Sequence, residues 1–199
     1  MTRSVLTVRP ITDERGVTLV ETMIYALLSV VVLSVAGSML ITSLDTQRDV
    51  SSITEAASVG QVISTDVANG IRNSSAFQVE TPTALGQTLR SRSVSVTSAG
   101  VTEWRCQAWY LAASGTFYAT SSTAGAVPQP TAAADLAGWR LLGESIAVPA
   151  GAGQAFTGSG GQLVLAIEVG AGTAKPTLIN TTIAARPQSN TGTVPTTCF

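Results

Sequence analysis

An uncharged, strongly apolar run from Thr22 to Leu44 is the feature of this sequence that most limits its fold. At about 1.5 Å of rise per residue, the part from Met23 to Leu44 forms a helix of roughly 33 Å, close to the ~30 Å hydrocarbon thickness of a bilayer. The run therefore predicts a membrane-spanning helix near the N-terminus. A carboxylate, Glu21, directly precedes the run, and the next charged residue is Asp45.

Glu21 lies where a carboxylate is energetically expensive. At or just inside the membrane interface an ionisable side chain is costly unless it is paired, and such a residue is a functional-site hypothesis by default. We therefore expect a cation to pair with Glu21.

The residues from Gly16 to Glu21, Gly-Val-Thr-Leu-Val-Glu, resemble the processing and N-methylation signature of type IV prepilins and pseudopilins, usually written G-F-T-L-I-E. The resemblance implies cleavage between Gly16 and Val17 by a prepilin peptidase and methylation of the new amine on Val17. It also implies that Glu21 pairs with the N-terminal amine of a neighbouring subunit during filament assembly. Such a pair makes two buried charges tolerable that would each be costly alone. Val17 departs from the phenylalanine that is commonest in the signature.

An ordinary secretory signal or a signal anchor is the alternative interpretation. A secretory signal has its apolar core before the cleavage site, with a basic region ahead of that core. Residues 1–16 instead lack an apolar core and carry charged residues, namely Arg3, Arg9, Asp13, Glu14 and Arg15. This order favours the interpretation that residues 1–16 are a prepilin leader. A plain single-pass anchor remains the alternative.

The composition suits an extracytoplasmic domain that is rich in β-structure. The 199 residues fit one domain plus an appendage, and they include 18 glycines, 45% hydrophobic residues and 12% charged residues. The net charge is -1, whereas capture of nucleic acid needs clustered Lys and Arg. We interpret the close pair Arg90 and Arg92 as a solvated strand edge, so no clear nucleic-acid site is predicted.

The sequence contains no histidine, the usual general base of enzymes. The glycine-rich pieces from Gly151 to Gly161 do not follow the spacing of a phosphate-binding loop. Two cysteines do not complete a tetrahedral zinc shell. We therefore predict no catalytic residue, no metal site and no cofactor, and we do not expect an enzyme.

Cys106 and Cys198 lie on the side of the apolar run that we expect to be exported. In an oxidising compartment an isolated pair of this kind favours a disulfide, with two buried thiols as the alternative. A bridge would close a loop of about 90 residues and contribute on the order of 4 kcal/mol in the chain-entropy model.

Beyond Leu44 the helical pattern continues but becomes amphipathic. Apolar or small residues recur in steps of three and four, and charged residues such as Asp49, Glu55 and Asp66 fall largely on other faces. We expect a single helix from Val17 to about Asn73, with an apolar half over 17–44 and an amphipathic half within 45–76.

From Phe77 the periodicity falls to two, which predicts a β-rich domain over residues 77–199. The segment Val101–Leu111 is expected to place Trp104, Cys106, Ala108 and Tyr110 on the core face, which makes Trp109 the candidate for exposure. We expect Thr123–Gly138 and Gly151–Gly161 to be loops. The further ordered segments are Ser93–Thr97, Gly115–Thr120, Gly138–Leu142, Ser145–Val148, Gln162–Val169 and Pro176–Ala185. The predicted fold is α+β: a long N-terminal helix packed on a C-terminal antiparallel sheet.

A second resemblance covers more of the chain. The end of the predicted helix, from Asp66 to Ser74, is similar to a D-V-x-x-x-I-R-x-x run in minor pilins of the PilW/PulJ type. The order of the later segments, closing on Ala185-Arg186-Pro187, is similar to the C-terminal domain of that group.

The leading functional hypothesis is a minor type IV pilin or pseudopilin, a structural subunit that primes or joins a filament through its N-terminal helix. The resemblance implies other pilin subunits, the prepilin peptidase and the inner-membrane assembly platform as partners. It implies a single-pass location in the inner membrane before assembly, with the C-terminal domain extracytoplasmic, and then a place in a pilus or pseudopilus. The alternative is a membrane-anchored extracellular binding module that captures a ligand through residues 123–138 or Trp109. The sequence leaves open which machine the filament would serve.

Overall fold

The computed structural model describes residues 16, 18–96, 99–100, 102–186 and 198–199. The chain divides into two compact units, with Gln47 ending the first and Arg48 beginning the second. Most of the predicted leader, Val17 and residues 187–197 lie outside the described residues.

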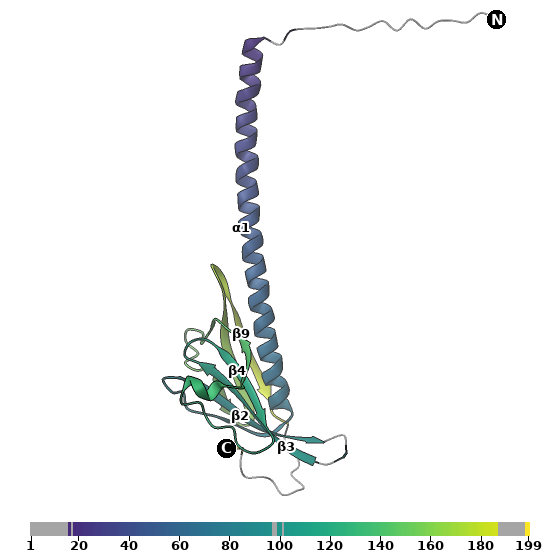
Figure 1. Cartoon of the computed structure of the whole chain (residues 1–199), viewed down its shortest axis with the longest axis vertical. Helices are drawn as coiled ribbons and strands as arrows, with labels where there is room; N and C mark the ends of the chain where they lie inside the picture. The colour runs from purple at the N-terminus through teal and green to yellow at the C-terminus, as the bar shows by residue number, and fades with distance from the viewer. Residues whose placement is uncertain (1–15, 17, 97–98, 101, 187–197) are drawn as a thin grey trace, which may run out of the picture. The chain divides into compact units, whose positions relative to one another are not determined.

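Helix α1 runs from Leu19 to Arg72, close to the predicted span (Figure 1). The helix contains no proline, and Thr18 precedes its first residue as the N-cap. At its other end the Ser74 hydroxyl donates to the carbonyl of Ile71 at 2.7 Å. This bond satisfies a carbonyl that the ending helix leaves without an intrahelical partner.

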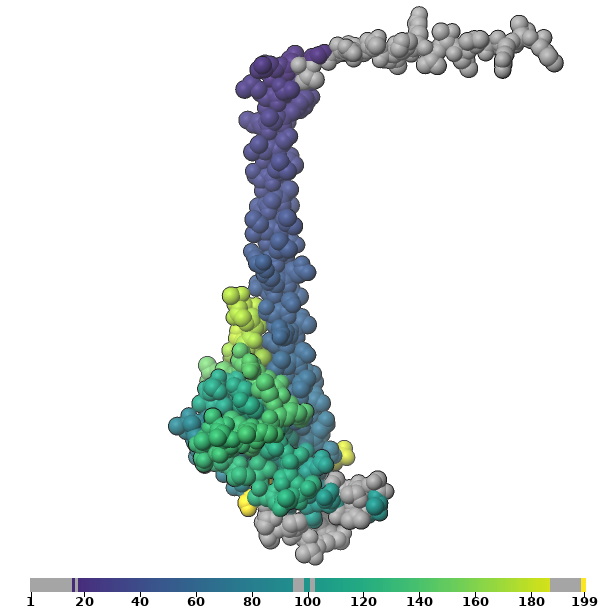
Figure 2. Space-filling view, in the orientation of Figure 1, coloured from purple at the N-terminus to yellow at the C-terminus, as the bar shows by residue number. Residues whose placement is uncertain are grey.

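In the first unit the large apolar side chains of α1 are exposed, and none of its most apolar stretch is buried within the structure. Figure 2 shows one side of this helix. The hydroxyls within this run donate back to carbonyls one turn earlier, at 2.7 Å from Ser29 to Tyr25, 2.8 Å from Ser34 to Val30 and 3.0 Å from Thr42 to Ser38. Hydrocarbon offers no hydrogen-bond partners, so a helix exposed to it must satisfy its polar groups internally. By length and composition this part of α1 is compatible with a single-pass membrane anchor.

The second unit contains two antiparallel sheets. Sheet A has the strand order β1-β2-β3-β4-β5. Its strands are β1 (Ser74–Val79), β2 (Gly86–Val96), β3 (Thr102–Ala112), β4 (Phe117–Ser122) and β5 (Arg140–Gly143). The β-structure therefore begins at Ser74, directly after the helix and three residues before the predicted start of the β-domain at Phe77.

Sheet B is built around β8, which pairs with β9, β6 and β7. Strands β6 and β7 pair with different residues of β8. Its strands are β6 (Ile146–Ala147), β7 (Phe156–Ser159), β8 (Gln162–Ala171) and β9 (Ala174–Ala184). Strand β7 lies inside the stretch Gly151–Gly161 that was predicted to be a loop. A short 3-10 helix, η1 (Ala133–Leu136), lies in the predicted loop Thr123–Gly138.

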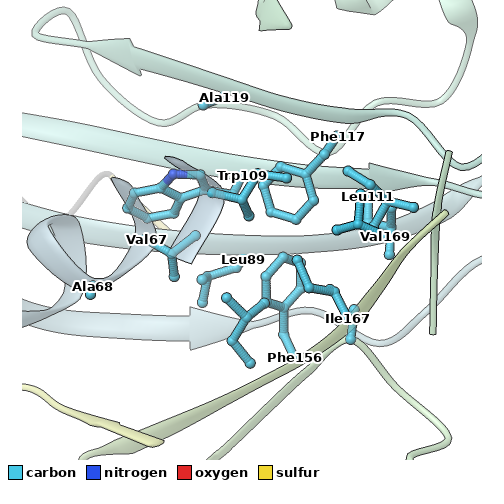
Figure 3. Packing of buried hydrophobic residues seen from close by; sticks show 14 of the residues in the cluster. Val67, Ala68, Leu89, Trp109, Leu111, Phe117, Ala119, Phe156, Ile167 and Val169 are labelled. Carbon is cyan, nitrogen blue, oxygen red and sulfur yellow. The ribbon is translucent and has the colours of Figure 1, made fainter. Parts of the chain in front are cut away.

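The main core lies where α1, sheet A and sheet B meet within the second unit (Figure 3). Phe117 of β4 and Phe156 of β7 join the two sheets through an edge-on contact with ring centroids 5.8 Å apart. On the helix, a Cβ added at Gly70 would overlap the Trp109 ring. Glycine at this position therefore lets the helix lie close to β3, which confirms the predicted α+β packing.

The prediction of which face of β3 is buried was only half right. Cys106, Ala108 and Tyr110 are buried, but they form the outer side of sheet A. Cys106 and Ala108 belong to a smaller cluster that includes Val127, and Tyr110 contacts Trp139 edge-on beside it. The main core takes the opposite side, which we call the helix side, through Trp109 and Leu111. Trp109 is 2% exposed, so the prediction that it is the exposed tryptophan was wrong.

Candidate functional site

The head of α1 carries the residues that the sequence marks as functional. Glu21 lies in the first turn, and its backbone N–H donates to the Thr18 hydroxyl at 3.3 Å. Thr18 therefore acts as an N-cap, and Glu21 occupies the third helical position, where a negative charge interacts favourably with the helix dipole. Gly16 is exposed and precedes the helix, while Val17, the other predicted processing residue, lies outside the described residues.

Tyr25 is a neighbour of Glu21 that sequence reasoning missed. Its hydroxyl donates to Glu21 Oε1 at 2.8 Å from one turn further along the helix. The four-residue spacing was the available signal, because side chains four positions apart share a helix face. Among the described residues the second carboxylate oxygen, Oε2, accepts no hydrogen bond, so Glu21 retains an acceptor for an external donor.

Cys106 and Cys198 form the predicted disulfide, with their Cα atoms 5.4 Å apart. Both cysteines are buried, and they pack with Ala108, Val127 and Trp139 on the outer side of sheet A. The bridge therefore holds the end of the chain against the middle of β3.

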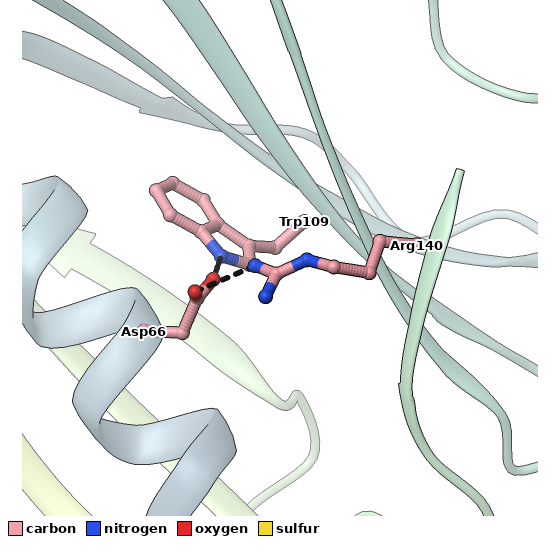
Figure 4. A network of polar contacts seen from close by, with 3 residues as sticks. All are labelled: Asp66, Trp109 and Arg140. Carbon is pink, nitrogen blue, oxygen red and sulfur yellow. Dashed lines mark hydrogen bonds and ion pairs between the residues drawn. The ribbon is translucent and has the colours of Figure 1, made fainter. Parts of the chain in front are cut away.

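Asp66 joins the helix to sheet A (Figure 4). The Trp109 indole N–H donates to its Oδ2 at 2.8 Å, and an Arg140 Nη donates to its Oδ1 at 2.7 Å. The helical periodicity had placed Asp66 away from the apolar face of the helix. Its carboxylate instead satisfies the one polar atom of a buried tryptophan side chain.

Replacing Asp66 by alanine is expected to lower the free energy of unfolding by about 1–3 kcal/mol, because the Trp109 N–H would remain buried without a partner. The full-length chain in detergent, unfolded with urea and followed by tryptophan fluorescence, provides the measurement. Asp66→Asn keeps one carbonyl acceptor, so it should lower the free energy of unfolding by less than Asp66→Ala. Stability of Asp66→Ala within about 0.5 kcal/mol of the original chain, as for an ordinary surface change, would contradict this role.

Arg90 and Arg92 do not form the predicted solvated strand edge, since β2 is an interior strand between β1 and β3. Arg90 pairs with Glu80 at 2.7 Å, and both side chains are less than a fifth exposed. Arg92 lies over the Trp104 ring, 5.3 Å from its centroid. Both guanidinium groups thus take part in contacts within the domain.

The described residues contain no group of three or more His, Cys, Asp or Glu side chains arranged to hold a metal ion. No protein-family model matches the chain, and comparison with curated proteins and solved structures likewise gives no significant match.

Proposed function

We propose that the protein is a minor type IV pilin or pseudopilin, a structural subunit that primes or joins a filament through α1. One observation carries the proposal: Glu21 stands at the head of a helix whose next charged residue is Asp45 and whose intervening apolar side chains are exposed on every face. An amphipathic surface helix would show one apolar stripe, whereas a helix that is apolar all round belongs in a membrane or among other helices.

The chemistry at Glu21 supports the same proposal. Hydrolysis between Gly16 and Val17 by a prepilin peptidase would leave an ammonium group on Val17. In the filament, that ammonium group on a neighbouring subunit would donate to the Oε2 of Glu21 while Tyr25 holds Oε1. Because both charges lose water in an apolar bundle, the pair forms at one axial offset between helices and thereby fixes the stagger of the subunits.

The rest of the molecule fits an exported domain presented by such a helix. The Cys106–Cys198 disulfide suits an oxidising compartment outside the cytoplasm. Before assembly the subunit would sit in the inner membrane as a single-pass protein, in contact with the assembly platform. Other pilin subunits would then replace lipid around residues 19–44.

Processing provides the direct test. Produced together with a prepilin peptidase, the chain is expected to lose residues 1–16, so that intact-mass and N-terminal peptide spectrometry finds Val17 as the first residue. Without the peptidase, or with Gly16→Leu, the chain should remain uncut. A chain that still starts at Met1 beside an active peptidase, or one cut after an apolar segment, would exclude this proposal.

A further inference from the structure

A polar cavity of about 420 Å³ lies in the second unit, where α1 faces the helix side of sheet A. Its charged lining residues are Asp66 from the helix, Arg105 from β3 and Arg140 from β5. Further polar residues of the wall are Gln107, Trp109, Thr120 and Ser121. This volume falls within the ~300–1,000 Å³ typical of small-ligand sites.

The strand register explains why these side chains meet. Trp109 of β3 lies opposite Ala119 of β4, and Ala119 lies opposite Arg140 of β5, so the three share one face of the sheet. Ala119 carries only a methyl group between two long side chains. Ala119 itself lines the cavity, so its small side chain leaves room between Trp109 and Arg140.

Several donors around the cavity lack a protein partner. Within the part of the chain that the structure describes, the side chains of Arg105, Gln107 and Ser121 make no hydrogen bond or ion pair. They follow one another on the helix side, because Gln107 lies opposite Ser121 and Arg105 is two residues before Gln107. The Arg140 side chain is 64% exposed, and one of its Nη atoms donates to Asp66. Its other N–H groups remain available to a ligand.

The charges around the cavity indicate the kind of ligand. Arg105 and Arg140 contribute two positive charges and Asp66 one negative charge, which leaves a balance of one positive charge. A monoanion neutralises that balance, whereas a phosphate dianion would leave a negative excess beside Asp66. A guanidinium group presents two parallel N–H donors that match the two oxygens of a carboxylate.

We propose that this cavity binds a carboxylate, held by Arg105 and the free N–H groups of Arg140, with the Gln107 amide and the Ser121 hydroxyl as neutral donors. A small acid and an acidic side chain of another protein are the two sources of this group, since both present a carboxylate. The site is independent of the pilin proposal, because every residue in it belongs to the second unit.

Calorimetric titration of the full-length chain in detergent tests the proposal with two probes. N-acetylglycine represents a small acid, and a capped pentapeptide with one central glutamate represents a protein side chain. We expect saturable one-to-one binding of at least one probe, and the tighter of the two identifies the source. The neutral analogue N-acetylglycinamide should not bind.

Arg105→Gln is the diagnostic variant, because among the described residues the Arg105 side chain makes no hydrogen bond or ion pair that the substitution would break. Because Arg105→Gln removes a charge-assisted hydrogen bond, we expect the affinity for the carboxylate to fall about tenfold or more. Arg186→Gln removes the same charge from outside the cavity and should leave the dissociation constant unchanged. Binding of neither carboxylate, equal effects of the two variants, or tighter binding of inorganic phosphate would overturn the assignment. The thermal melting of each variant confirms that it is folded.

Discussion

Replacing Glu21 by alanine or glutamine is expected to abolish incorporation of the chain into filaments while leaving its insertion into the membrane intact. Without the carboxylate, the ammonium group on Val17 of the neighbouring subunit would be buried with no counter-ion. Removing one partner of a buried ion pair costs roughly 3–5 kcal/mol, which corresponds to a loss of more than about a hundredfold in association. Immunoblots of sheared filaments and of washed membranes, from cells that carry the matching assembly machinery, measure the two fractions.

Glu55→Gln is the matched control, since it removes one exposed carboxylate from the same helix within the second unit. It should assemble normally. Normal assembly of Glu21→Gln as well would mean that Glu21 only stabilises the helix N-terminus, a contribution of about 0.3–1 kcal/mol that a helix of this length does not need. That result would remove Glu21 from the proposed assembly mechanism.

Loss of the disulfide is the second large expected effect. Replacing both Cys106 and Cys198 by alanine opens a covalent loop across a sequence separation of 92 residues. In the chain-entropy model this lowers the free energy of unfolding by about 4 kcal/mol. For a domain of this size the melting temperature should fall by roughly 8–16 °C, which near-ultraviolet circular dichroism of the full-length chain can follow.

A reducing agent supplies the internal control for this prediction. It should bring the melting temperature of the original chain down to that of the double variant, and it should leave the variant itself unaffected. If the double variant melts at the same temperature as the oxidised chain, the bridge adds nothing to the stability of the domain.

The long helix and the antiparallel character of the β-domain were predictable, because both follow from local periodicity. The side of β3 that packs against the main core was not predictable from periodicity. Alternation identifies the core side only when the other side meets water, and here both sides are covered. Arg105 and Gln107 give the helix side a polar sequence pattern, although they line a cavity next to the buried Trp109.

The contacts of Asp66 illustrate a second limit of sequence reasoning. Its partners Trp109 and Arg140 lie 43 and 74 residues away in the chain, so no local pattern connects them. Tyr25 is different, because it follows Glu21 by one helical turn and its contact was open to prediction. Glycine is an unfavourable helix residue, and the Trp109 ring that lies against Gly70 explains its presence there.

The disulfide also determines which part of the domain resists a mechanical load. A pulling force applied between α1 and Phe199 passes along the backbone to Cys106 and then directly through the sulfur atoms to Cys198. The backbone between the two cysteines lies outside the covalent path of the force. Tension therefore acts along β1, β2 and the first half of β3, and not along β4 to β9. Even complete unravelling of the loaded strands would lengthen the molecule by only the stretch from Asn73 to Cys106.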